Sequence, residues 1–338
     1  MEENLIYVER DKLRRLFLDK FVKAGLGKEF AEKTADLMIF ADERGIHSHG
    51  SVRAEYYVNR IKAKGFNLSP NLNFEQTGPC SGVYHGDNAV GHYVAFKAME
   101  DAIALAENNG VAVVGIREMG HSGAIGYFVE QAALKGMIAL TMCQSDPMVV
   151  PYGGVKPYFG TNPIAFASPR KNEKPIIFDM ATTVQAWGKI LDARSKGKNI
   201  PETWAVDENG EPTTNPNEVA ALLPVAGPKG YGLMMMIDIL SGILLGLPFG
   251  KHVSSMYKEL TEYRRLGQLH IVINPAFFGD ENIFLDQISQ MVDELHSIPP
   301  AKGFDQVYYP GEIQETIINS YKKTGIPVEK NIYEYLTQ

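Results

Sequence analysis

Residues 111–143, VAVVGIREMGHSGAIGYFVEQAALKGMIALTMC, place two short apolar runs on either side of a glycine-rich turn and an amphipathic stretch. The runs 111–116 and 137–143 each follow a glycine, and short apolar runs bounded in this way are typical of buried strands. The stretch between them opens with small residues and then spaces its apolar side chains at helical intervals. This order predicts a strand–helix–strand unit, and therefore an α/β fold.

Outward from this unit, strands and helices continue to alternate through the middle of the chain. The pattern predicts strands at 81–85, 163–168, 175–179 and 270–278, and helices at 89–107, 183–196 and 226–246. The two ends of the chain instead show helical spacing, at 10–24, at 29–43 and from about 281 onward. We therefore expect an α/β domain over residues 76–294 and a helical cap domain in which residues 1–75 pack with residues 295–338.

The composition limits the classes of protein to consider. With 338 residues, 45% of them hydrophobic, the chain can bury a sizeable core without disulfides. The formal net charge is −7 and no basic cluster is present, so we expect no nucleic-acid partner. The two cysteines, Cys80 and Cys143, cannot form a disulfide framework, which favours a reducing, cytoplasmic location.

We expect neither a secretory signal nor a membrane span in this chain. Residues 1–4, Met-Glu-Glu-Asn, lack the basic and apolar regions of a secretory signal. The most apolar stretch, 231–247, is shorter than the roughly 20 residues that a membrane span needs. It also contains Asp238 and several glycines. We expect a buried helix there and no membrane partner.

The turn Met119-Gly120-His121-Ser122-Gly123 is the most informative candidate for chemistry. It lies between a predicted buried strand and a helix, and ligands of α/β proteins gather beyond the carboxyl ends of strands. Small neighbours allow a ligand to approach the imidazole, which exchanges protons readily near neutral pH. His121 is therefore either an acid–base residue or a histidine that only caps the helix.

The next strand is followed by Gln144-Ser145-Asp146-Pro147. If the two strands are neighbours in the sheet, Asp146 comes close to His121 and can fix its tautomer and stabilise its cationic form. The alternative for Asp146 is an ordinary Asp-Pro turn or a helix cap.

A third cluster, Arg44 to Arg53, contains two histidines, two hydroxyl groups and two arginines within ten residues. Arg53 has the planar fork that grips a carboxylate through two hydrogen bonds. The His47-Ser48-His49 pattern also suggests a metal, but a metal needs at least one more ligand and none has suitable spacing. We expect no metal site.

The segment Gly227-Pro228-Lys229-Gly230-Tyr231-Gly232 begins the apolar helix and suits an anion, because backbone N–H groups and a lysine converge there. It is neither a P-loop nor the GxGxxG fingerprint of a Rossmann dinucleotide site. Either the chain binds no dinucleotide, or it binds one with a different fold. From the residues alone, we expect a small-molecule α/β enzyme of the acid–base kind with an anion-binding segment.

Taken together, the loops resemble those of the malate/L-lactate dehydrogenase family of the second type. The matching motifs, in chain order, are Ala41-Asp42-x-Arg44-Gly45, Ser48-His49-Gly50, Gly120-His121-Ser122-Gly123, Gly160-Thr161-Asn162-Pro163, Asp179-Met180-Ala181-Thr182-Thr183 and Lys229-Gly230-Tyr231-Gly232-Leu233. The resemblance implies a non-Rossmann NAD(P)-binding domain with a mixed sheet, NAD as cofactor, a small hydroxy-acid substrate and at least a homodimer.

The same resemblance implies roles for individual residues. His121 matches the proton acceptor, and Asp146 matches the carboxylate beside it. The implied substrate residues are Ser48, His49, Arg53 and Tyr57. The implied NAD contacts are Ser145, Asp179, Met180, Ala181, Lys229, Gly311, Glu312 and Ile313.

Longer stretches narrow the resemblance to the members of the family that oxidise ureidoglycolate. These stretches are CQSDPMVVPYGG, FDMATTVQAWGKILDARS, AGPKGYGLMMMIDILSG, LGLPFGKHVSSMY and GFDQVYYPGE. We therefore expect NAD-dependent oxidation of ureidoglycolate to oxalurate. The alternatives are a malate, lactate or sulfolactate dehydrogenase of the same family, a metal-dependent hydrolase or lyase using His47, His49 and His121, and a non-catalytic binding protein.

Overall fold

The computed structural model describes residues 4–338, so residues 1–3 of the predicted cap segment lie outside it. Its centre is a seven-stranded sheet. In spatial order the strands are β2 (Asn73–Gly78), β3 (Ser81–His85), β4 (Val111–Met119), β10 (Leu266–Ile273), β5 (Ile138–Cys143), β6 (Ile164–Ser168) and β7 (Ile176–Met180). Strands β3 and β4 are parallel, and the other neighbouring pairs are antiparallel. The expected α/β fold with a mixed sheet is confirmed.

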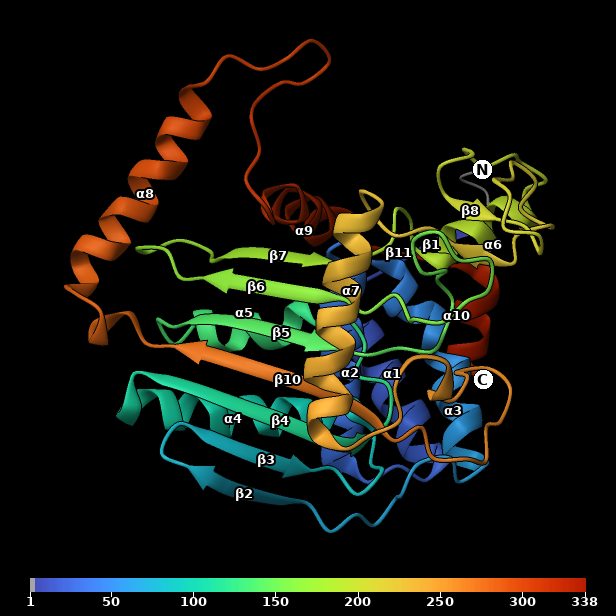
Figure 1. The fold of residues 1–338 in the computed structure, drawn as a ribbon, viewed down its shortest axis with the longest axis horizontal. Helices are drawn as coiled ribbons and strands as arrows, with labels where there is room; N and C mark the ends of the chain where they lie inside the picture. Colours follow the sequence, from blue (N-terminus) through green and yellow to red (C-terminus); the bar gives the residue numbers. More distant parts are fainter. Residues whose placement is uncertain (1–3) are drawn as a thin grey trace.

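Helices cover the two faces of the sheet unequally (Figure 1). Helices α4 (Gly91–Asn109) and α5 (Gly126–Ala133) lie behind the sheet in this view, and α7 (Pro228–Ser241) crosses in front. The alanines of α4 allow its backbone to approach β4 closely, and Ala98 and Ala102 are buried in one core with Val114 and Ile116. Burying such a branched side chain contributes about 1.5–3 kcal/mol.

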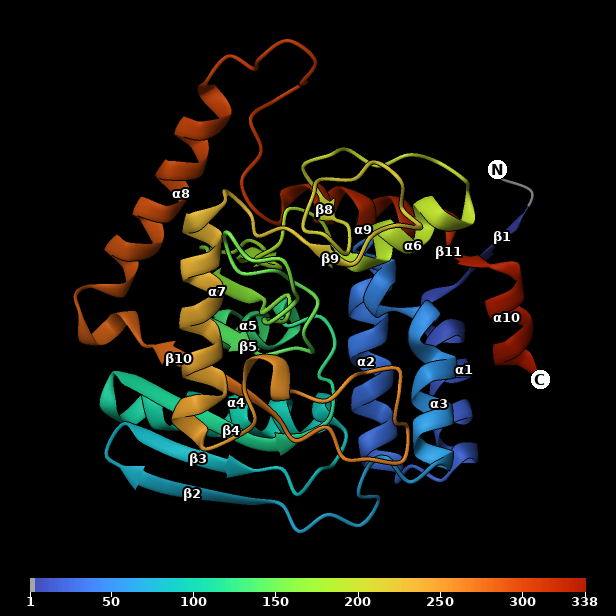
Figure 2. The ribbon, with the colours of Figure 1, turned by 45° about the vertical axis from the view of Figure 1, so that its right-hand side comes forward.

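The two ends of the chain pack together on one side of the sheet, as expected (Figure 2). Their elements are α1 (Arg10–Ala24), α2 (Lys28–Glu43), α3 (Ala54–Lys62), α10 (Lys330–Thr337) and the antiparallel strands β1 (Leu5–Val8) and β11 (Ile326–Glu329). Phe17, Phe21 and Tyr57 share a buried core with Val328 and Leu336. The exact domain boundaries at 75/76 and 294/295 stay a prediction.

Helix α7 differs from the fully buried helix that its apolar sequence predicts. The segment Pro228–Leu245 is long and apolar enough to cross a membrane by length and composition, yet one of its faces packs on β5 and β10. On that face Asp238 accepts a hydrogen bond from the Gly250 N–H at 2.9 Å. The opposite face leaves apolar side chains exposed, at Met235, Met236, Ile239, Ile243 and Leu244.

The remaining elements extend from this frame. Helix α6 (Trp187–Ser195) and the short strand pair β8 (Ala205–Val206) and β9 (Ala221–Leu222) surround a small core of their own. Helix α8 (Glu281–Ser297) stands away from the sheet, and Val292 is its one buried residue (Figure 1). Helix α9 (Glu312–Thr324) then returns beside β7.

Candidate active site

The strand order decides which loops meet. Strands β4 and β5 both pair antiparallel with β10, so their carboxyl ends lie at the same edge of the sheet. The His121 turn follows β4, and Ser145 and Asp146 follow β5. The residues that lead into β10 therefore lie between the two loops, a feature that no local pattern in the sequence reveals.

The start of α4 presses directly against the His121 turn. A Cβ atom built at Gly91 would lie 2.2 Å from the carbonyl oxygen of Gly120 and 2.8 Å from that of His121. Only a residue without a side chain allows this approach. The close fit places the second residue of α4, His92, beside the imidazole of His121.

His121 is oriented by a tyrosine. The Oη atom of Tyr57, on α3, lies 2.7 Å from Nδ1 of His121, and the Tyr57 side chain is fully buried. Burial lowers the pKa of His121 well below its usual value of 6.5, and nearby His49 and Arg53 lower it further. His121 is therefore a neutral base at pH 7.

Two further imidazoles surround it. The ring of His49 is stacked on His121, with centroids 5.7 Å apart and an angle of 18°. The ring of His92 lies edge-on to Tyr57 at 4.8 Å, and neither of its nitrogens has a hydrogen-bond partner among the described residues. Burial lowers the pKa of His49 to about 4 and that of His92 to about 3. Both rings are neutral at pH 7.

His92 does not stand out in the sequence. Its only signal was a histidine between Gly91 and Tyr93 at a predicted helix start, which most often marks an ordinary core or cap residue. His92 contacts Tyr57 because α4 lies close to α3. These two helices are separated in the sequence, so a local sequence pattern does not reveal the contact.

A buried carboxylate holds the predicted substrate loop in place. Asp42 accepts hydrogen bonds from the Ser51 N–H at 2.7 Å and from Nδ1 of His47 at 2.9 Å. A Cβ atom at Gly50 would lie 2.0 Å from Oδ1 of Asp42, so glycine is required there. Burial raises the pKa of Asp42, and the hydrogen bond from His47 opposes that shift. These contacts explain Asp42 and Gly50 in the motifs.

The structure brings the four predicted substrate residues together. Oγ of Ser48 lies 3.0 Å from Nδ1 of His49, and Nε of Arg53 donates to the carbonyl oxygen of Ser48 at 2.8 Å. His49 and Tyr57 both contact His121. One side of the site thus combines a cation with a neutral imidazole that can accept a proton.

Asp146 lies at the predicted strand end, but its partners differ from the one expected. It accepts from Nη2 of Arg264 at 3.2 Å and from the Met256 N–H at 3.1 Å, while the hydrogen-bond partner of His121 is Tyr57. The reason is the strand order: Arg264 lies two residues before the start of β10, between the two loops, and pairs with the carboxylate. The side chains of Arg264 and Asp146 are only 1% and 9% exposed.

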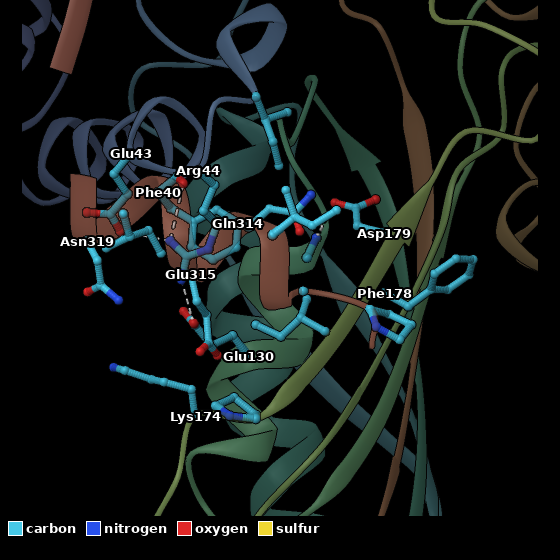
Figure 3. Close-up of a pocket in the computed structure, with 18 of the residues that line it drawn as sticks. Phe40, Glu43, Arg44, Glu130, Lys174, Phe178, Asp179, Gln314, Glu315 and Asn319 are labelled. Carbon is cyan, nitrogen blue, oxygen red and sulfur yellow. Dashed lines mark hydrogen bonds and ion pairs between the residues drawn. The ribbon is translucent and has the colours of Figure 1, made fainter. Parts of the chain in front are cut away.

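Some of the predicted cofactor residues line a cavity of about 800 Å³ between α2, α5, β7 and α9 (Figure 3). Asp179, Gly311 and Ile313 are among its lining residues. Asp179 accepts a hydrogen bond from the Gly126 N–H at 2.8 Å, and burial raises its pKa to about 6. In Figure 3 Asp179 lies on one side of the cavity and Asn319 on the other.

Charged side chains are also paired inside this cavity. Arg44 donates to Glu43 at 2.7 Å and to Glu130 at 2.6 Å, and its guanidinium lies over the ring of Phe40. These pairs leave the lining of the cavity mixed in charge rather than strongly basic or acidic.

The other predicted cofactor residues lie along the adjoining strand ends. The Thr161 N–H donates to Oγ of Ser145 at 2.8 Å, and the Thr182 N–H donates to the carbonyl oxygen of Thr161 at 2.9 Å. This ladder sets Ser145 beside the segment that contains Met180 and Ala181. Lys229 lies exposed in the first turn of α7.

Glu312 is the exception within the Gly311–Ile313 segment, because it does not line the cavity. Its carboxylate accepts from the Tyr309 N–H at 3.1 Å and from Nε2 of Gln306 at 3.1 Å, and it pairs with His296 at 2.9 Å. The side chain thus stabilises the loop before α9. Among residues 4–338, no three His, Cys, Asp or Glu side chains converge in a way that could hold a metal ion.

Comparison with known proteins agrees with the motifs. The profile of the malate/L-lactate dehydrogenase family matches residues 8–337. A protein of Escherichia coli K12 named ureidoglycolate dehydrogenase (NAD(+)) is 58% identical over 97% of this chain and 94% of its own length.

Two solved structures have the same fold. Sulfolactate dehydrogenase from Methanocaldococcus jannaschii superposes with a TM-score of 0.91 at 38% identity, covering 98% of this chain and 95% of its own. Malate dehydrogenase from Pyrococcus horikoshii superposes with a TM-score of 0.90 at 35% identity, covering 99% and 94%. The family resemblance predicted from the loops is confirmed.

Proposed function

Because the chain belongs to the malate/L-lactate dehydrogenase family, we propose that it is an NAD-dependent dehydrogenase that oxidises ureidoglycolate to oxalurate. The substrate rests on the 58% identity with a relative named for that reaction. The chemistry rests on one observation above all, a neutral His121 whose Nδ1 is held by Tyr57 at 2.7 Å. Oxidation of a 2-hydroxy acid needs such a base, because the hydroxyl proton must leave as the hydride leaves carbon.

The tautomer of His121 follows from the reaction. In the productive form Nδ1–H donates to the oxygen of Tyr57, so the lone pair of Nε2 is available for the hydroxyl proton of the substrate. Burial raises the pKa of Tyr57, so the phenol keeps its own proton and remains a neutral acceptor. General base catalysis of this kind typically contributes 10²- to 10⁴-fold in rate.

The residues present fit NAD. A cavity of about 800 Å³ lies within the usual size of a ligand site, and both Asp179 and the first turn of α9 face it. Lys229, exposed in the first turn of α7, is suited to a phosphate. When bound, NAD supplies the hydride acceptor. Asp179, Met180, Ala181, Gly311, Ile313, Ser145 and Lys229 are the residues that we propose hold it.

We also propose that two copies of the chain form a homodimer in the cytoplasm. Within residues 4–338 nothing covers the apolar face of α7, and α8 stands away from the sheet with Ile283 and Met291 exposed. Contiguous exposed apolar side chains of this kind are typical of an interface. Two free cysteines, one of them buried, suit a reducing compartment. Light scattering of the purified protein should give twice the 37.4 kDa chain mass, and a monomer would contradict the dimer.

A substrate panel tests the reaction. Purified protein is mixed with NAD and with ureidoglycolate, malate, lactate or sulfolactate in turn, while NADH absorbance is followed. The proposal predicts the highest kcat/KM for ureidoglycolate and oxalurate as its product. Faster turnover of malate, lactate or sulfolactate would assign the chain to another activity of the family.

A further inference from the structure

Residues 254–264 form a loop whose two ends are tied together. Nη2 of Arg264 donates to the carbonyl oxygen of Ser254 at 2.8 Å, and its Nε donates to Oγ of the same residue at 3.2 Å. The segment has the size and closed neck of a compact surface loop, a type that frequently carries function. We refer to it as the 254–264 loop.

Hydrogen bonds from three parts of the chain hold this loop beside the predicted substrate residues. Asp146, at the end of β5, accepts from Arg264 and from the Met256 N–H. Arg60, a buried residue of α3, donates to the carbonyl oxygen of Glu262. Because the ion pair between Arg264 and Asp146 has almost no exposure to solvent, breaking it would leave an uncompensated buried charge.

The third of these contacts is with Arg53. Nη1 of Arg53 donates to Oη of Tyr257 at 2.6 Å, while Nε is already engaged by Ser48. The guanidinium therefore keeps both hydrogens of Nη2 and one hydrogen of Nη1 for a ligand. Tyr257 accepts in this contact, so its own O–H hydrogen remains free to donate.

Tyr257 and Arg53 form a hydrogen-bonded pair in which both side chains keep donor hydrogens for a ligand. The Tyr257 side chain is 45% exposed, so a solute can reach it. A phenol that accepts from a guanidinium is polarised and donates more strongly. A carboxylate has room for about four hydrogen bonds, more than the arginine fork supplies alone.

We propose that Tyr257 is a substrate-binding residue, whose hydroxyl donates to the carboxylate that Arg53 binds, and that the 254–264 loop positions it. This inference rests on the proposed function, oxidation of a 2-hydroxy acid, and on the expectation from the sequence that Arg53 binds the substrate carboxylate. It also assigns Asp146 a positioning role: its carboxylate holds Arg264 and Met256, and through them the loop that carries Tyr257.

The test uses Tyr257→Phe and oxamate, an unreactive carboxylate next to a carbonyl group. Titration calorimetry measures oxamate binding to the protein saturated with NADH. Loss of a hydrogen bond to a charged group weakens binding by roughly tenfold or more, and we expect that loss for Tyr257→Phe. KM for the hydroxy acid rises by the same factor, while kcat changes less than about twofold and NADH affinity does not change.

Tyr263→Phe is the matched control. Tyr263 lies on the same loop, is 44% exposed, and makes no side-chain hydrogen bond among residues 4–338. Unchanged oxamate affinity in Tyr257→Phe, an equal loss in Tyr263→Phe, or a wild type that does not bind oxamate would each overturn the inference. If oxamate binding depends on Tyr257 but ureidoglycolate is not oxidised, the inference stands and the proposed substrate fails.

Discussion

Around His121 the side chains of Tyr57 and His92 are buried and contact each other, whereas the cavity beside Asp179 is lined by side chains that reach solvent. Tyr57 and His92 are both fully buried, but Phe178 and Ile313 in the cavity wall are 38% and 50% exposed. A proton acceptor needs a fixed tautomer and a shielded environment. A cofactor that must enter and leave needs an open path. The two regions are therefore built for different steps.

The comparison leads to distinct kinetic signatures. Changes around His121 should alter kcat, because they affect a group that acts in the transition state. Changes around the cavity and Lys229 should alter the affinity for NAD with little effect on kcat.

The largest effect is expected for His121→Ala. Removing the base should lower kcat by about 10²- to 10⁴-fold. Fluorescence titration with NADH should give an unchanged Kd, because the cavity beside Asp179 is left intact. A variant that turns over like the wild type would show that another group accepts the proton.

Asp146→Asn should act mainly through the loop. Removing the charge leaves Arg264 buried without its counterion, and breaking such a pair costs about 3–5 kcal/mol of unfolding free energy. Urea denaturation measures this loss. In the folded variant, KM should rise as in Tyr257→Phe. A selective loss of kcat with unchanged KM would instead favour a direct contact with His121.

His92→Phe should change how stability depends on pH. The pKa of His92 is lowered to about 3 in the folded chain. Above pH 6.5 this histidine is neutral in both the folded and the unfolded chain and does not lower stability. As the pH falls from 6.5 toward 3, the unfolded chain binds the proton and the folded chain does not, so the free energy of unfolding falls. Phenylalanine keeps an aromatic ring but cannot bind the proton. The stability of the variant minus that of the wild type should grow by up to about 1.4 kcal/mol per pH unit between pH 6.5 and 4.

Urea unfolding of both proteins at pH 7, 6 and 5 measures that difference. A subtraction is needed because other groups, such as Asp179 with its raised pKa, change stability in the opposite direction. Parallel curves for the two proteins would mean that His92 is exposed to protons in the folded state.

The smallest effect is expected on the cofactor side, for Lys229→Ala. An exposed lysine facing a phosphate contributes little, so Kd for NAD should rise by roughly fivefold with kcat unchanged. The control is Lys189→Ala, because Lys189 is also an exposed lysine but lies on α6 rather than on α7. A fall in kcat for Lys229→Ala would remove the distinction between the two regions.

Much of the fold could be predicted from local pattern. The helix predicted at 10–24 is α1 (Arg10–Ala24), and that predicted at 29–43 is α2 (Lys28–Glu43). Helix α3 was missed because its nine residues carry several charges and owe their burial to α1. The four-residue strands β1 and β11 were missed because each depends on a partner more than 300 residues away.

The residues of the site also divide into those that a local sequence pattern reveals and those that it does not. His121 could be selected because its turn has a local signature of glycines between a strand and a helix. The partnership of Asp146 with Arg264 could not, because it follows from the insertion of β10 between β4 and β5. The resemblance to a family supplied the remaining residues, and the structure shows how Tyr57 and Tyr257 connect them.

The state of the His121 imidazole is the central claim, and NMR of the ¹⁵N-labelled protein measures it directly. Comparison with His121→Ala assigns its ring nitrogens between pH 8 and 5. We expect a ring that is neutral at pH 7 and whose pKa lies well below 6.5, with the proton on Nδ1 facing Tyr57 and a bare Nε2. A ring that becomes charged near pH 6.5, or one that carries its proton on Nε2, would contradict it.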